Sequence, residues 1–65
     1  MEHSFNIEFA TKHGLDEAIL HHYYILFRYL NKSDPTIPEL LEHFTYWDIS
    51  HISFLINKLL DQKLI

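Results

Sequence analysis

Apolar residues recur at three- and four-residue intervals in four stretches of the chain, and capping or turn-forming residues bound each stretch. Spacing of this kind places the apolar side chains on one face of an α-helix. The pattern therefore predicts an all-α fold of four helices. We expect them to run from Asn6 to His13, from Leu15 or Asp16 to Leu30 or Asn31, from Ile37 to Phe44, and from a cap at Asp48 or Ser50 to about Gln62.

Local signals set the predicted helix ends. Asn6 can cap the first helix, and Gly14 can adopt the left-handed conformation that often ends a helix. Residues 31–35, with the sequence NKSDP, are turn-forming, because the proline keeps the residue before it out of the helical region. Thr36 and Glu39 have the spacing of a capping box and predict the start of the third helix.

The second predicted helix is apolar around nearly its whole circumference. Its polar residues form one narrow stripe, which we expect to face solvent: Glu17, His21, Arg28 and Lys32. The other helices of so short a chain are expected to leave part of the apolar surface uncovered, so we predict a homodimer through this helix. The predicted interface residues are Leu20, Tyr23, Tyr24 and Phe27.

The other helices are amphipathic. The first is expected to face inward through Phe5, Phe9 and Ala10, and the third through Ile37, Leu40, Leu41 and Phe44. The inward positions of the last helix are Ile49, Ile52, Leu55, Ile56 and Leu59, and its outward positions are His51, Phe54, Lys58 and Asp61. Between these helices Trp47 is predicted to cover the core, and after them Leu64 and Ile65 mark a point where an extended strand could begin.

The composition indicates a single domain spanning residues 1–65. The chain is 48% hydrophobic and 15% aromatic, which is too apolar for a disordered chain. Without cysteine it has neither a disulfide framework nor a thiolate metal site, so an intracellular setting is expected. The first residues lack the regions of a secretory signal, and charged residues interrupt the longest apolar stretch, 15–30, so we expect no membrane interaction.

The six histidines do not form a recognisable metal or catalytic motif. Glu17 and His21 share one helical face, but His22 points about 100° away, so we expect no metal site. Neither an HExxH motif nor a glycine-rich phosphate loop occurs. Ser50 and His51 are neighbours in the sequence, which does not make a catalytic pair. We therefore predict a non-enzymatic protein without a cofactor or a small-molecule substrate.

The order of the helices indicates a helix-turn-helix arrangement, in which a short helix, a turn and a longer amphipathic helix follow a buried helix. Residues 3–22 (HSFNIEFATKHGLDEAILHH) and 50–65 (SHISFLINKLLDQKLI) resemble the winged-helix domains of phage and prophage replication proteins, the replisome-organiser or DnaD-like initiators. The resemblance implies a small helix-turn-helix bundle of winged-helix type with a reduced or absent wing. It also implies association with DNA and the cytoplasm of a bacterial or phage-infected cell.

The resemblance makes the last helix the recognition helix. Its predicted contacts with DNA or another partner are Ser50, His51, Ser53, Phe54, Asn57 and Lys58. Duplex binding depends on Lys and Arg that neutralise phosphates, yet the net charge is −4 and residues 36–65 hold two lysines against four acidic residues. We therefore predict a DNA-associated accessory or regulator of replication or transcription. Its DNA binding should be weak and rise below about pH 6, where histidines gain charge.

The same helix supports an alternative function. Phe54 beside His51 is suited to a protein interface, which Tyr46 and Trp47 could extend. Phe54 could equally pack under a loop or in a dimer seam. In the alternative, the chain is a protein-binding inhibitor or adaptor of host or defence machinery, which keeps the fold without strong DNA binding.

Overall fold

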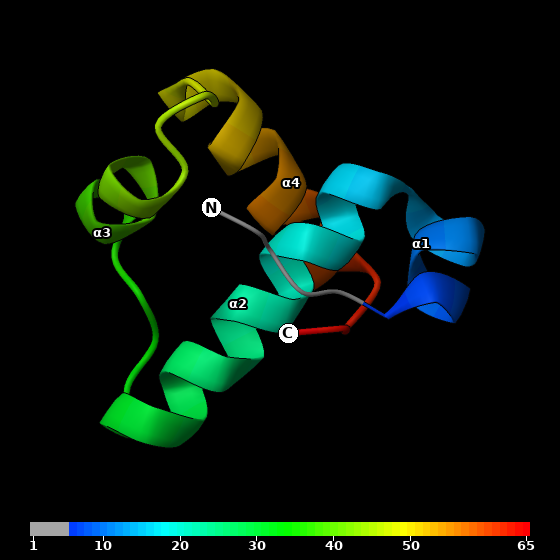
Figure 1. Cartoon of the computed structure of the whole chain (residues 1–65), viewed down its shortest axis with the longest axis horizontal. Coiled ribbons are helices and arrows are strands. Elements are labelled where there is room, and N and C mark those ends of the chain that lie inside the picture. The colour runs from blue at the N-terminus through cyan, green and yellow to red at the C-terminus, as the bar shows by residue number, and fades with distance from the viewer. Residues whose placement is uncertain (1–5) are drawn as a thin grey trace.

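The computed structural model describes residues 6–65, which form four α-helices (Figure 1). They are α1 (Ile7–His13), α2 (Leu15–Asn31), α3 (Ile37–His43) and α4 (Ile49–Asp61). This part of the chain contains no β-strand, so the predicted all-α class and the four helices are confirmed. Phe5, expected to face inward, lies outside the described residues. None of the four helices is long and apolar enough to cross a bilayer.

Side-chain caps begin three of the helices. The Asn6 carboxamide oxygen accepts a hydrogen bond from the Phe9 backbone N–H at 2.9 Å. Thr36 and Glu39 form the predicted capping box at the start of α3. Asp48, rather than Ser50, caps α4. These short-range bonds satisfy backbone N–H groups that a helix start leaves unpaired, which is why the predicted starts are correct.

Gly14 joins α1 directly to α2. Its φ of 114° and ψ of 154° lie in a region open almost only to glycine, although not in the left-handed helical region that the sequence predicted. A β-carbon at this position would overlap the Glu17 carboxylate. The glycine therefore allows both the sharp turn and the close approach of Glu17.

The core lies where α2, α3 and α4 meet. α3 and α4 pack against each other, α4 also packs on α2, and α1 covers another side of α2 (Figure 1). Trp47 stacks on Phe44 with ring centroids 4.6 Å apart and packs against the core, which confirms its predicted role as a cover. The radius of gyration is 11.0 Å, as expected for a compact chain of this length. The fully buried core residues are Leu20, Leu40, Phe44, Ile52, Leu55 and Leu59.

The chain after α4 turns back onto the core instead of starting a strand. Lys63 adopts the left-handed conformation with φ 58°. Its N–H donates a hydrogen bond to the Leu60 carbonyl, and the Leu64 N–H donates one to the Leu59 carbonyl. These two bonds form the Schellman pattern that ends many helices. Leu64 and Ile65 are half-buried against the core. The apolar character of these two residues therefore reflects core packing.

Three predictions about the faces of α2 and α4 are wrong. The expected solvent stripe of α2 is partly internal, since Glu17 is only 9% and Tyr24 only 7% exposed. In the predicted dimer interface, Leu20 is fully buried in the chain's own core, Tyr24 is buried as well, and Tyr23 and Phe27 are half-buried. Ile49, expected inward, is exposed because it lies in the first turn of α4 at the edge of its apolar stripe.

Candidate functional site

The outer side of α4 is the surface that the sequence put forward for binding. Four side chains at intervals of four, three and four residues point away from the core, and we call them the α4 face: Ser50, Phe54, Asn57 and Asp61. Phe54, near the centre, is 59% exposed. This excludes a position for Phe54 under a loop of the described chain. The α4 face thus presents an aromatic ring between small polar groups and one carboxylate.

The two basic side chains of α4 turn towards α2 instead. The Nε2 atom of His51 lies 2.8 Å from the Oδ2 atom of Asp16. The ammonium group of Lys58 donates to the Glu17 carboxylate and, at 3.3 Å, to the His13 carbonyl. We call these two side-chain contacts the α2–α4 clamp. The clamp joins residues 35 and 41 positions apart in the sequence and holds α4 against the start of α2.

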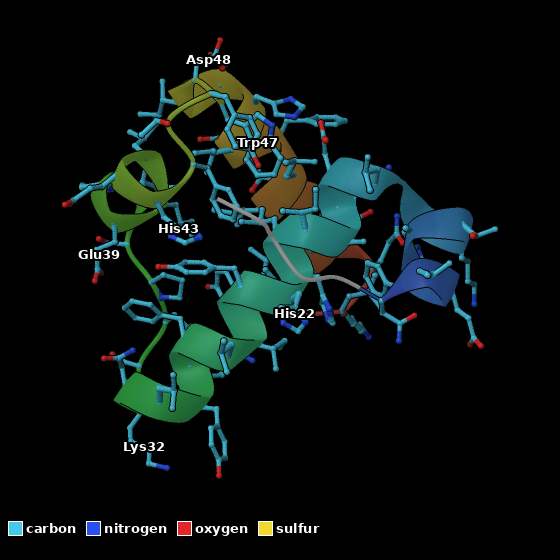
Figure 2. All side chains as sticks on the ribbon, in the orientation of Figure 1. His22, Lys32, Glu39, His43, Trp47 and Asp48 are labelled. Carbon is cyan, nitrogen blue, oxygen red and sulfur yellow. The ribbon has the colours of Figure 1, made fainter. Side chains whose placement is uncertain are left out.

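The clamp depends on how the helices begin. Asp16 and Glu17 lie in the first turn of α2, where carboxylates also favour the positive end of the helix dipole. The Asp48 cap starts α4 so that His51 and Lys58 share one side of that helix, seven residues apart. Trp47 lies next to this start, as Figure 2 shows together with Asp48, and its ring centroid is 5.3 Å from that of His51.

The clamp changes the electrostatics of the predicted recognition helix. Asp61 on the α4 face and Asp48 at the start of α4 are both exposed and acidic. Lys58, the lysine of α4 itself, is paired with the buried carboxylate of Glu17. The α4 face therefore carries no lysine or arginine to set against a phosphate.

The structure brings only some of the residues predicted to contact DNA or a partner together on one surface. Ser50, Phe54 and Asn57 share the α4 face, whereas Ser53 is half-buried beside them. His51 and Lys58 belong to the clamp. Sequence reasoning missed the clamp. It took Asp16 as a possible helix start and placed Glu17 on the solvent-facing stripe of α2, because periodicity does not reveal a partner on another helix.

The histidines serve mainly as packing groups. His21 stacks on Phe9 at 4.3 Å, and its ring N–H donates to the Leu64 carbonyl. Burial lowers the pKa of His21 below its ordinary value of 6.5, against the raising effect of that hydrogen bond. His43 stacks on Tyr23 at 3.9 Å and helps α3 contact α2. Among residues 6–65 no three histidine or carboxylate side chains gather as metal ligands would.

Comparison of the chain with protein-family models, curated proteins and solved structures found no match.

Proposed function

We propose that this chain is a non-enzymatic protein-interaction module of helix-turn-helix type, which docks on another protein through the α4 face. The observation that carries the proposal is the α2–α4 clamp. It engages both basic side chains of α4 and leaves Phe54 as the largest side chain on the exposed side. An exposed aromatic ring is a common anchor of protein interfaces, whereas a surface without cations is a poor duplex-binding surface.

The helix-turn-helix assignment rests on connectivity. α3 and α4 are separated by residues 44–48 and pack against each other, with α2 behind them. In DNA-binding proteins of this type the second helix of the motif enters the major groove. We propose that α4 keeps this position in a winged-helix-type bundle with a reduced or absent wing, as an adaptor or inhibitor of host or defence machinery.

The α4 face also defines the chemistry of its partner. Phe54 requires an apolar pocket, and burying its ring supplies most of the binding free energy. Asp61, about two helical turns beyond Phe54, favours a lysine or arginine at the edge of that pocket. Ser50 and Asn57 add hydrogen-bonding groups. The partner is therefore a protein with an apolar pocket rimmed by basic residues.

DNA association is the rival function, and exposed Ser50 and Asn57 favour it because both side chains can hydrogen-bond to base edges. Fluorescence anisotropy of a labelled duplex, titrated at about 50 mM and 200 mM salt, separates the two. We expect no saturation up to roughly 100 µM protein. Saturable binding in the low micromolar range that weakens steeply with salt would overturn the protein-docking proposal.

The partner experiment compares substitutions on two different helices. A protein captured from the cell that carries this gene is purified, and its affinity is measured for the wild-type chain, Phe54→Ala and Ile7→Ala. Ile7 is 74% exposed on α1, outside the α4 face, and serves as the control for loss of an exposed apolar side chain. We expect Phe54→Ala to weaken binding at least about tenfold and Ile7→Ala to leave it unchanged. Equal effects of both substitutions would contradict docking through α4.

A further inference from the structure

α2 exposes an apolar surface that the other described helices leave uncovered. Its side chains, which we call the α2 patch, are His22, Ile25, Leu26, Tyr29 and Leu30. Four of these residues, Ile25, Leu26, Tyr29 and Leu30, are 39%, 46%, 71% and 66% exposed. A hollow of about 400 Å³ adjoins them, lined by Asn6, His21, His22, Ile25, Leu26 and Tyr29. Figure 2 locates His22 part-way along α2 and Lys32 at its end.

We propose that the α2 patch is the contact surface of an antiparallel homodimer. The inference is independent of the proposed function, because the α4 face does not include the α2 patch. The patch itself contains no aspartate, glutamate, lysine or arginine, although the chain as a whole has a net charge of −4. The Lys32 ammonium lies 5.2 Å from the centroid of the Tyr29 ring, and because Lys32 caps the end of α2, an antiparallel pair keeps the two Lys32 groups at opposite ends of the contact. Two copies can therefore meet at this surface without placing like charges against each other, as an uncharged apolar contact requires.

The positions of the side chains fit a two-fold axis. In a symmetric dimer, residue i contacts residue j while j contacts i. With the axis between Ile25 and Leu26, each Ile25 faces the Leu26 of the other copy, and each His22 faces a Tyr29. Ile25 and Leu26 then meet apolar partners at the axis, and Leu30 lies outside this central contact. Each Tyr29 hydroxyl has the imidazole of a His22 from the other copy within reach, so two such pairs form. The antiparallel arrangement also sets the two helix dipoles in opposite directions.

The size of the patch predicts a weak dimer. A standard interface buries about 800 Å² per partner, which is about one sixth of the 4573 Å² surface of this chain. The α2 patch offers a few hundred Å² on one helix face, in the range of functional patches on small proteins. We therefore expect a dissociation constant of about 0.1 mM, between the micromolar and millimolar limits of weak association.

Sedimentation equilibrium of the full chain from about 10 µM to 1 mM measures this association. The mean mass should rise from 7.9 kDa towards twice that value. Leu26→Glu places two carboxylates at the axis and should weaken association at least about tenfold, as should Tyr29→Lys. Leu60→Glu on α4, at a residue 51% exposed, is the matched control and should behave as the wild type. Helical circular dichroism verifies that each variant is folded.

The proposal is overturned if the mass of the wild-type chain stays at 7.9 kDa over the whole concentration range. It is also overturned if Leu60→Glu abolishes the association while Leu26→Glu and Tyr29→Lys leave it intact.

Disulfide trapping tests the relative direction of the two α2 helices, since the natural chain has no cysteine that would interfere. A mixture of His22→Cys and Tyr29→Cys chains should cross-link as a heterodimer. Neither should cross-link with itself, because seven residues separate the positions by about 10 Å along the axis. Equal cross-linking of each chain with itself contradicts the antiparallel arrangement.

Discussion

Replacing Lys58 by methionine is the strongest test of the α2–α4 clamp. Methionine keeps most of the side-chain volume but removes the ammonium group, which leaves Glu17 charged with its carboxylate largely enclosed. The Glu17 side chain is 11% exposed and that of Lys58 is 33% exposed. Breaking a fully buried pair costs about 3–5 kcal/mol, whereas an exposed pair contributes about 0–1 kcal/mol. The clamp lies between these limits, and we expect a loss of about 2 kcal/mol.

A loss of this size is easily measured in so small a protein. A chain of 65 residues has a free energy of unfolding of about 3–10 kcal/mol, and about 2 kcal/mol lowers the melting temperature by about 8–16 °C. Urea and thermal unfolding of Lys58→Met should show this loss. Adding Glu17→Gln should recover part of it, because the enclosed charge is then absent.

The matched control is Lys12→Met, which removes the same charge from an exposed position on α1. We expect its stability to stay within about 0.5 kcal/mol of the wild type. If Lys58→Met proves as stable as Lys12→Met, Glu17 is not an enclosed charge that depends on Lys58. The proposal that the clamp withdraws the Lys58 charge from the α4 face would then fail as well.

Three further predictions concern the backbone and pH. Because burial lowers the pKa of His21, the folded chain binds fewer protons than the unfolded chain just below pH 6.5. The free energy of unfolding should therefore fall as the pH drops through the lowered pKa, and His21→Gln should flatten that fall in urea titrations. Gly14→Ala should destabilise the fold by about 2 kcal/mol in the same assay, through its positive φ and the overlap with Glu17. Lys63→Gly should raise the free energy of unfolding by about 1 kcal/mol, because glycine adopts the left-handed conformation without strain; no change would contradict that reason.

The helix boundaries could be predicted because their causes are local. Asn6 bonds to the N–H three residues ahead, as do Thr36 and Asp48, so each start is visible within a few residues of sequence. The apolar stripes of α3 and α4 likewise follow from spacing alone. These signals were sufficient for the four helices and most of the core.

The orientation of α2 could not be predicted in the same way. Glu17 is buried because Lys58, 41 positions later, neutralises it, and Gly14 leaves space for its carboxylate. Tyr24 is buried too, although a tyrosine beside a polar stripe suits an exposed surface. Once these residues turn inward, Leu26 and Tyr29 must face outward on the same helix. Contacts between distant segments, rather than periodicity, therefore decide which side of an almost wholly apolar helix is covered.

Shift mapping by NMR most directly tests the claim that the α4 face binds protein and not DNA. A ¹⁵N-labelled chain is titrated with a 20-base-pair duplex at low salt, and the backbone signals of Ser50, Phe54 and Asn57 are followed. We predict that these signals stay in place while the purified protein partner shifts them together. A saturable, clustered shift of the same three signals on addition of the duplex would contradict the account.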